Sequence, residues 1–410
     1  MLHHLINRPK GKENKIALFG FLTANGISLI GNHLTMIAVP WFVLETTESA
    51  AKTGMVGFFS ALPAVLAMFF GGPIIDRMGY KKISIISDIA SGMTVVLIPL
   101  LYYNFGLKPW GLMVLVFLSA LLDAPGSTAR SALLPDIARI GVVDLERVNA
   151  IQQTIRRGSS LIGPAIAGFL INSMESGRVL WLDGLSFAIS AFIFYLAIPS
   201  GSGNPAVKMN YLVDIKDGLN FLRHNPLILS LVSIVAITNF LDAPLFSIVI
   251  PVYAKSLFGD ATKLGIMLAT YGAGAMIGSL VFAAIGARLP RRNTFVLSFI
   301  LVGLPYWILL LKPSFLIIVI SMFLNGILTG PLNPLIMTVM QEQVPSQMRG
   351  RVFGMISAGA YIATPLGILL AGFLMESLSV YITISVIAAG YLLVTCTQIF
   401  NKSLLAMNRE

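Results

Sequence analysis

Residues 71–82 read Gly-Gly-Pro-Ile-Ile-Asp-Arg-Met-Gly-Tyr-Lys-Lys, and they lie between two long apolar runs at 54–70 and 83–103. The glycines allow a tight reversal of the chain, because a residue without Cβ adopts a positive φ at little cost. Asp76 and Arg77 place opposite charges at the end of one expected helix and near the start of the next, where helix dipoles act on them. A short charged loop between two membrane-length runs predicts a helical hairpin in a membrane protein.

The composition supports a membrane protein. The 410 residues are 56% hydrophobic and 11% charged, with a mean hydropathy of +0.84, whereas a soluble domain has about 25% charged residues. The net charge of +10 does not indicate a nucleic-acid partner, because the basic residues are spread over many short loops. Cys396 is the single cysteine, so no internal disulfide is possible. The histidines show no metal-ligand spacing.

Twelve apolar segments follow one another along the chain, each long enough to cross about 30 Å of hydrocarbon as a helix. They lie at 16–43, 54–73, 83–103, 110–132, 149–172, 179–199, 226–250, 263–286, 293–311, 314–340, 351–374 and 379–400. The interval 199–223 is the longest polar break. We therefore expect an all-α membrane protein with a six-helix half at 1–200, a cytoplasmic linker at 201–225 and a second six-helix half at 226–410.

The distribution of basic residues predicts the orientation of these segments. If the N-terminus is cytoplasmic, nineteen of the 28 Lys and Arg residues fall in cytoplasmic segments and six fall outside. Cytoplasmic loops of membrane proteins carry such an excess of Lys and Arg. Both termini are therefore predicted to be cytoplasmic.

The two halves contain similar short motifs. Residues 37–40 resemble residues 248–251, and Gly54 follows the first motif at the interval at which Gly265 follows the second. Residues 163–170 likewise match residues 367–374. The offsets are 211 and 204 residues, and a nearly constant shift indicates an internal duplication.

The spacing Gly72-x-x-x-Asp76-Arg77-x-Gly79-x-Lys81-Lys82 resembles the signature loop between helices two and three of the major facilitator superfamily. Residues 133–136, 163–168, 341–345 and 349–354 further resemble the efflux branch with the macrolide exporters and the enterobactin exporter. The resemblance implies twelve helices in two pseudo-symmetric halves. It also implies proton-coupled export by alternating access across a bacterial cytoplasmic membrane, with the proton gradient in place of a cofactor.

The same resemblance assigns roles to two groups of residues. The loop would act as a conformational latch, in which the Asp76 carboxylate caps a helix of the second half and Arg77 pairs with Asp136. The full set is Gly72, Asp76, Arg77, Gly79, Lys81 and Asp136. The alternative is a solvated turn that follows the positive-inside rule. On helix five, Gly163, Pro164 and Gly168 resemble the antiporter motif, in which small residues permit close helix packing, although the usual closing Gly-Gly pair is absent.

Among the titratable residues inside apolar segments, His33, Asp123 and Asp242 are the candidates for proton coupling. An ionised group in hydrocarbon costs several kcal/mol unless it is paired or faces water, so a functional role is the default hypothesis. The repeat places Asp242 close to the equivalent of His33. We expect these two to approach each other when the outer gate closes, and proton exchange at this pair or at Asp123 to couple to export. The alternative for each is a hydrogen-bonded structural group.

Polar and aromatic residues at helical spacing predict the faces that line a substrate cavity. Helical spacing places such residues on one face, and amides in hydrocarbon must find partners or water. The candidates are Asn25, Asn32, Asn239, Phe246, Asn325, Asn333 and Tyr361, and Met36, Tyr271, Tyr306 and Met337 are further candidates for an adaptable apolar wall. Gln152, Gln153 and Arg156 are candidates for contacts to an anionic group. The alternative is hydrogen bonding between helices without substrate contact.

These features favour a secondary active exporter of a small amphipathic organic compound, with drugs or macrolides as the leading substrate class. Siderophore export, lysophospholipid transport and uptake by symport stay open as alternatives, and a membrane scaffold is disfavoured by the intramembrane acids. The partners expected are the lipid bilayer and the substrate, with no nucleic acid and a monomeric state. An enzyme is not expected, because the sequence has neither metal-ligand spacing nor a nucleophile elbow.

Overall fold

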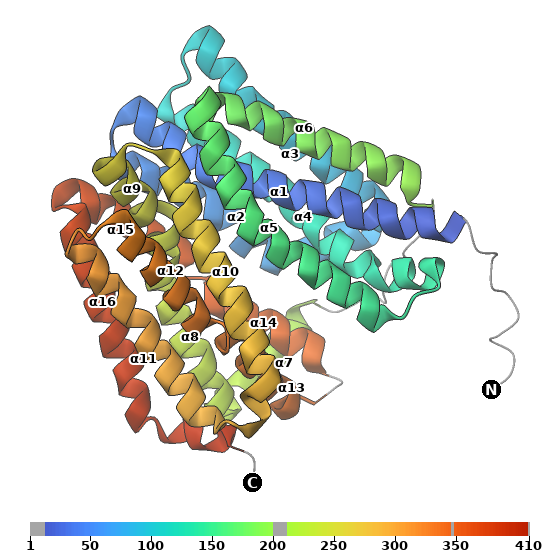
Figure 1. The fold of residues 1–410 in the computed structure, drawn as a ribbon. Helices are drawn as coiled ribbons and strands as arrows, with labels where there is room; N and C mark the ends of the chain where they lie inside the picture. The colour runs from blue at the N-terminus through green and yellow to red at the C-terminus, as the bar shows by residue number, and fades with distance from the viewer. Residues whose placement is uncertain (1–12, 200–210, 346–347, 409–410) are drawn as a thin grey trace, which may run out of the picture.

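The computed structural model describes residues 13–199, 211–345 and 348–408 (Figure 1). Within these ranges the side chains of 13–14, 68–77, 211–217, 287 and 349–351 are not among those described. The described residues form helices and short turns, without a strand.

Six long helices make up the N-terminal group. They are α1 (Glu13–Thr47), α2 (Ala50–Met78), α3 (Tyr80–Phe105), α4 (Pro109–Gly141), α5 (Leu145–Met174) and α6 (Ser176–Ala197). Helix α1 packs along α6, and α3 packs between α4 and α6. Sequential helices joined by short loops thus form one antiparallel bundle.

The C-terminal group contains more breaks. Its helices are α8 (Pro226–Pro244), the π-helix η1 (Leu245–Val249), α9 (Ile250–Phe258), α10 (Ala261–Ile285), α11 (Arg291–Leu310), α12 (Phe315–Thr329), α13 (Leu332–Gln343), α14 (Arg349–Tyr361), α15 (Thr364–Ser377) and α16 (Val380–Thr397), with short 3₁₀ turns η2 (Gly286–Arg288), η4 (Gln398–Phe400) and η5 (Lys402–Met407). Helix α7 (Tyr211–His224) lies within the interval expected to be a linker and packs on α14 and α8.

The expected twelve segments appear with two differences. Eleven of the described helical stretches are long and apolar enough to cross a membrane. The remaining expected segment is α5, which packs against α1 and α10 but carries Arg156 and Arg157 in its middle. Three expected spans of the second half are interrupted where Pro244, Pro331 and Pro365 occur, because proline cannot donate the helical hydrogen bond.

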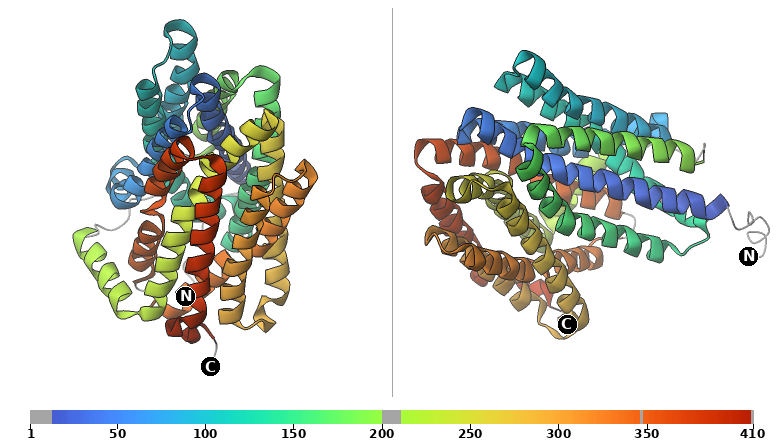
Figure 2. Two further views of the ribbon diagram at one scale, coloured as in Figure 1. Left: turned by 90° about the vertical axis from the view of Figure 1, so that its left-hand side faces the viewer. Right: turned by 45° about the horizontal axis from the view of Figure 1, so that its top comes forward.

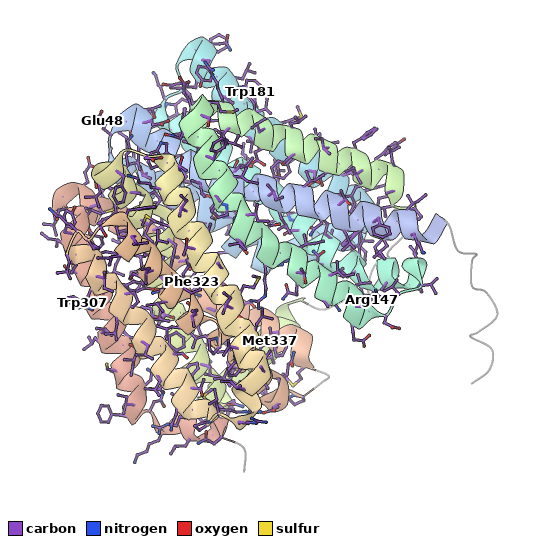
Figure 3. The ribbon with its side chains drawn as sticks, in the orientation of Figure 1. Glu48, Arg147, Trp181, Trp307, Phe323 and Met337 are labelled. Carbon is purple, nitrogen blue, oxygen red and sulfur yellow. The ribbon has the colours of Figure 1, made fainter. Side chains whose placement is uncertain are left out.

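The two groups of helices converge at one end of the molecule and diverge at the other (Figures 1 and 2). We call the end that contains residues 47–50 and 377–380 the closed end, and the end that contains Glu13 and Met407 the open end. In Figure 3, Glu48 lies at the closed end and Arg147 lies toward the open end. The two groups are therefore closest to each other near the closed end.

Glycine pairs hold the two groups in close contact near the closed end. A Cβ at Gly54 of α2 would lie 2.7 Å from the Cα of Gly372 of α15. A Cβ at Gly168 of α5 would lie 2.9 Å from the Cα of Gly265 of α10. Gly54 and Gly265 are equivalent in the repeat, as are Gly168 and Gly372, so one backbone contact occurs twice. Small residues of this kind permit the closest helix approach in membranes.

A carboxylate adds a polar contact to this seam. Glu376, at the end of α15, accepts hydrogen bonds from the hydroxyl of Ser49 and the backbone N–H of Ala51, both at 3.2 Å. These donors lie at the start of α2, where unpaired N–H groups and the helix dipole favour an anion. Across the same end, the Lys255 ammonium lies 6.0 Å from the ring centroid of Trp41. The closed end is thus joined by both packing and charge.

Replacing Gly168 with alanine should weaken the seam. The new methyl would lie 2.4 Å from the backbone oxygen of Ala261, and we expect overpacking to cost about 1–3 kcal/mol. The melting temperature of the purified protein in detergent measures this loss. The matched control is Gly158→Ala on the same helix, where nothing lies within 4 Å of the new Cβ, so stability should be unchanged or rise by up to about 1 kcal/mol. Equal melting temperatures for the two variants would contradict this account of the seam.

Candidate substrate cavity and buried charges

A cavity of about 440 Å³ lies between the two groups of helices. Helices α1 and α5 form one wall, and α8, η1 and α10 form the other. Its lining residues are His33, Met36, Arg157, Ser160, Pro164, Ala243, Phe246, Ser247, Leu268, Tyr271, Gly272, Ala275 and Met276. This volume is typical of small-molecule sites, and the wall is largely apolar with few polar groups. We call it the central cavity.

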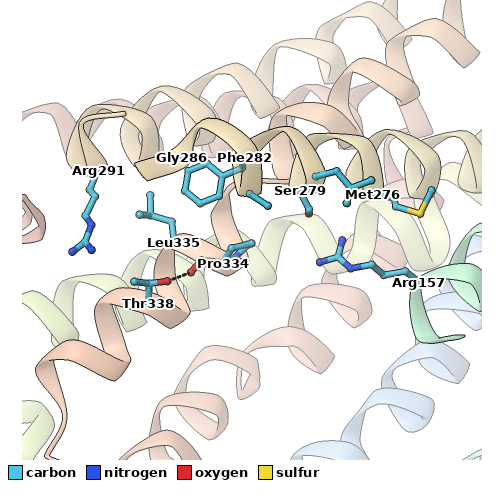
Figure 4. A pocket seen from close by; sticks show the side chains of 11 residues that line it. Arg157, Met276, Ser279, Phe282, Gly286, Arg291, Pro334, Leu335 and Thr338 are labelled. Carbon is cyan, nitrogen blue, oxygen red and sulfur yellow. Dashed lines mark hydrogen bonds between the residues drawn. The ribbon is translucent and has the colours of Figure 1, made fainter. Parts of the chain in front are cut away.

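A second cavity of about 450 Å³ adjoins the first, because Arg157 and Met276 line both. Its wall comes from α5, α10, η2, α11 and α13, and Figure 4 shows the Arg157 side chain extending from α5 toward α10. At the other side of this adjoining cavity, Arg291 binds Glu342 through two hydrogen bonds of 2.6 and 2.8 Å. Arg157 therefore stands at the junction of the two cavities.

The π-helix η1 shapes one wall of the central cavity. The wider turn interrupts the regular helix directly after Pro244 and presents Phe246 and Ser247 to the cavity. The ring of Phe246 lies 4.5 Å from that of Tyr271 on α10, tilted by 41°. Such π-bulges are frequent at functional sites. Here the bulge places an aromatic pair in the cavity wall.

The sequence-predicted cavity residues separate into two groups. Phe246, Met36 and Tyr271 line the central cavity. The remaining candidates (Asn25, Asn32, Asn239, Asn325, Asn333, Tyr361, Tyr306 and Met337) are not among the residues that line either cavity. The Asn239 amide donates to the Ala360 carbonyl at 2.9 Å, and the Asn325 amide donates to the Val302 carbonyl at 2.9 Å. Both of these amides join helices, which is the alternative that the spacing left open.

Asp123 belongs to a buried ion cluster inside the N-terminal group. The Arg130 guanidinium lies 2.6 Å from Asp88 and 3.3 Å from Asp123, and Ser190 donates to the second oxygen of Asp88 at 2.6 Å. The side chains of Asp88 and Arg130 are 0% and 4% exposed, whereas Asp123 is 21% exposed. One cation thus serves two carboxylates, and Asp123 is the more accessible of the two.

Asp242 has a neutral partner. The Tyr306 hydroxyl donates to its carboxylate at 2.6 Å, and the Tyr306 ring packs edge-to-face on Tyr391 at 5.5 Å. Among the described contacts, no ion pair or hydrogen bond joins Asp242 to His33. The approach of these two side chains on closure of the outer gate stays a prediction. His33 lines the central cavity, and its buried Nδ1 has no hydrogen-bond partner among the residues that the structure describes.

The helix-five residues connect α1 with α10. A Cβ at Gly163 would lie 2.6 Å from the Cβ of His33. Pro164 lines the central cavity, and Gly168 contacts Gly265 at the seam. Helix α5 thus packs against α1 of its own group at Gly163 and against α10 of the C-terminal group at Gly168.

Asp183 is a further acid inside an apolar helix, and it was not among the residues predicted from the sequence. It is 0% exposed on α6 and accepts hydrogen bonds from Thr35 of α1 and from Ser186, the latter at 3.1 Å. The signal was present, because Asp183 lies inside the apolar segment 179–199. Its two hydroxyl partners give it a structural role between α1 and α6.

Comparison of the whole chain with known proteins identifies its family. The model of the Major Facilitator Superfamily matches residues 21–259 and 232–401. The chain belongs to this superfamily. The multidrug efflux pump Tap of Mycolicibacterium fortuitum is 28% identical over 391 residues, covering 94% of both chains. The macrolide efflux protein A of Streptococcus pyogenes is 22% identical over 371 residues, covering 89% of this chain and 91% of that protein.

Solved structures of the superfamily share the fold. The crystal structure of the nucleoside transporter NupG superposes with a TM-score of 0.71 at 13% identity, covering 95% of this chain and 98% of that one. The all-helical architecture with two pseudo-symmetric halves expected from the sequence is thereby confirmed as the major facilitator fold.

The signature loop of this superfamily member is described only in part. Helix α2 runs through Gly72, Asp76 and Arg77, but the side chains of these residues lie outside the described ones. Gly79 separates α2 from α3 with φ of +81°. The remaining two residues have partners within the N-terminal group. Lys81 donates to the carbonyls of Tyr195, at 2.9 Å, and Ile198 at the end of α6, and Asp136 pairs with Arg139 at 2.6 Å. The pairing of Asp136 with Arg77 stays a prediction.

Removing the cation of the buried cluster should destabilise the fold. Arg130→Gln would leave two carboxylates without their charge partner, and we expect a cost of about 3–5 kcal/mol. The yield of monodisperse protein and its melting temperature in detergent measure this effect. Arg139→Gln is the control on the same helix, because its side chain is 79% exposed and its ion pair should contribute at most about 1 kcal/mol. If both variants behaved alike, the cluster would not have the stabilising role assigned to it.

Proposed function

We propose that the protein exports amphipathic organic compounds from the cytoplasm in exchange for protons. The observation that carries this proposal is the similarity to a multidrug efflux pump over 94% of both chains. The central cavity supports it, because a largely apolar site of about 440 Å³ between the two groups suits organic compounds of drug size. Methionine and aromatic side chains in its wall (Met36, Phe246, Tyr271 and Met276) adapt readily to varied ligands.

Export would proceed by alternating access. In the proposed orientation the open end faces the cytoplasm, which agrees with the excess of Lys and Arg expected there. Substrate would enter the central cavity from that end, and the two groups would then rock so that the closed end parts. Asp76 of the signature loop would stabilise the state in which the open end is shut. This proposal makes the present structure the substrate-loading state.

Proton exchange is assigned to Asp242, with Asp123 and His33 as further candidates. Asp242 lies next to Ala243 and η1, which form the cavity wall, and its described partner is a neutral hydroxyl. A proton arriving there changes the net charge beside the π-helix, whereas Asp123 shares the charge of Arg130. Protonation of Asp242 is therefore the step we expect to bias the rocking of the two groups.

Cellular accumulation tests the export itself. Cells with and without the protein would receive several labelled drugs and macrolides, with and without a protonophore. We expect lower accumulation only in cells that contain the protein and retain their proton gradient. Equal accumulation in all four conditions for every compound would contradict export of this substrate class.

Asp242→Asn should uncouple transport from the proton gradient. The amide oxygen can still accept the Tyr306 hydrogen bond, so the fold should persist while the ionisable group is lost. In everted vesicles, the variant should lose gradient-driven uptake of a transported drug and retain exchange of labelled for unlabelled drug. Tyr306→Phe is the control, because it removes the hydrogen bond but keeps the carboxylate, and it should retain gradient-driven uptake. Full gradient-driven uptake by Asp242→Asn would remove this residue from the coupling mechanism.

A further inference from the structure

The walls of the two cavities contain two arginines, and one of them has no matching acid among the described side chains. Arg157 and Arg291 are the charged residues among those that line them, and no aspartate or glutamate is in either wall. Arg291 is neutralised by its two hydrogen bonds to Glu342. Arg157 has no carboxylate within ion-pair distance among the described side chains. Arg157, which is half-buried, therefore lines both cavities without a counter-ion among the side chains that the structure describes.

The intramembrane acids do not supply that counter-ion. Asp88 and Asp123 share Arg130, Asp183 accepts from Thr35 and Ser186, and Asp242 accepts from Tyr306. Each carboxylate is thus held by a partner within its own group of helices. The opposite arrangement, with an acid in the wall, would favour a cationic ligand, and it is not found among the described lining residues.

We infer that the central cavity binds amphipathic organic anions, with the acidic group of the ligand on Arg157 and its apolar body against Phe246, Leu268 and Met276. This inference rests on the proposed function and assigns its substrate class. A guanidinium binds carboxylates and other planar or tetrahedral acids through two hydrogen bonds. The low dielectric of the surrounding wall strengthens this attraction. It strengthens the repulsion between the guanidinium and a cationic ligand to the same extent.

His33 adds to the polar side of the site. It lines the central cavity together with Arg157 and Ser160, and its buried Nδ1 has no partner. One edge of the cavity thus presents a guanidinium from α5 and an imidazole from α1, while the Ser160 hydroxyl donates to backbone carbonyls of α5. The facing wall from η1 and α10 is mainly apolar. This asymmetry orients a ligand that has one acidic end.

Binding of three matched probes tests the inference. 2-Naphthylacetate, 2-(2-naphthyl)ethanol and 2-(2-naphthyl)ethylammonium share an aromatic body and differ in charge. Equilibrium dialysis of labelled probes against nanodiscs with and without the full-length protein gives the specific binding. A charge-assisted hydrogen bond should make the anion bind about tenfold more tightly than the alcohol, and the cation more weakly than either. Equal or tighter binding of the cation would overturn the inference.

Three variants locate the acidic group. Arg157→Gln should bring the affinities for anion and alcohol to within about twofold of each other, because the charge-assisted contact is lost. Arg157→Lys should retain a preference for the anion. Arg156→Gln removes the same charge from an adjacent, exposed position that lines neither cavity, and it should keep the full preference. An unchanged preference in Arg157→Gln, or a preference lost equally in Arg156→Gln, would contradict the assignment.

This test separates the inference from the proposed function. If cells export neutral and cationic drugs and the probes show no anion preference, the inference fails and export stands. If the probes show the Arg157-dependent preference and no compound is exported, the anion site stands and drug export fails.

Discussion

The structure depends on the close approach of backbones at the closed end. Gly54 on Gly372 and Gly168 on Gly265 bring four helices from the two groups within distances that no side chain would permit. Because these two pairs are related by the internal repeat, the seam has the same packing on both sides of the pseudo-symmetry axis. Packing of small residues replaces the hydrophobic effect as the source of helix association in lipid. In the present state the seam therefore keeps the closed end shut while the groups diverge toward the open end.

Polar groups inside the helices follow a consistent arrangement. Asp88, Asp123, Asp183 and Asp242 are each satisfied within their own group, by Arg130, by the hydroxyls of Thr35 and Ser186, or by Tyr306. Satisfied polar groups lower the cost of placing them in an apolar medium, so each group can move as a unit. The charge that is left over, on Arg157, lies where the two cavities meet. The interior surface is consequently basic and apolar, which sets the chemistry of the ligand that it accepts.

Much of the fold can be predicted from the apolar runs and the internal repeat of the sequence. Only part of the candidate site can be predicted in this way. The apolar runs give the spans, and the repeat of Gly54 and Gly168 identifies residues that meet across the seam. Spacing cannot tell whether an amide faces a cavity or a neighbouring helix, so Asn239 and Asn325 were placed among the cavity candidates while they bind carbonyls. A rotation of about 100° per residue separates Arg156 from Arg157, so the two arginines lie on different faces of helix five, and the sequence alone does not tell which face meets the second half. The π-turn at Phe246 depends on packing around Pro244 and was not predicted.

The central claim is that the two groups of helices move as units, so that the seam at the closed end parts when the open end shuts. Spin labels on Arg147→Cys and Gln343→Cys report the open end, and labels on Lys52→Cys and Leu378→Cys report the closed end, each in a background in which Cys396 is replaced by serine. Double electron–electron resonance in nanodiscs, at high and low pH and with a transported compound, gives both distances. The account predicts that the open-end distance shortens whenever the closed-end distance lengthens. Distances that stay constant, or that change in the same direction, would contradict it.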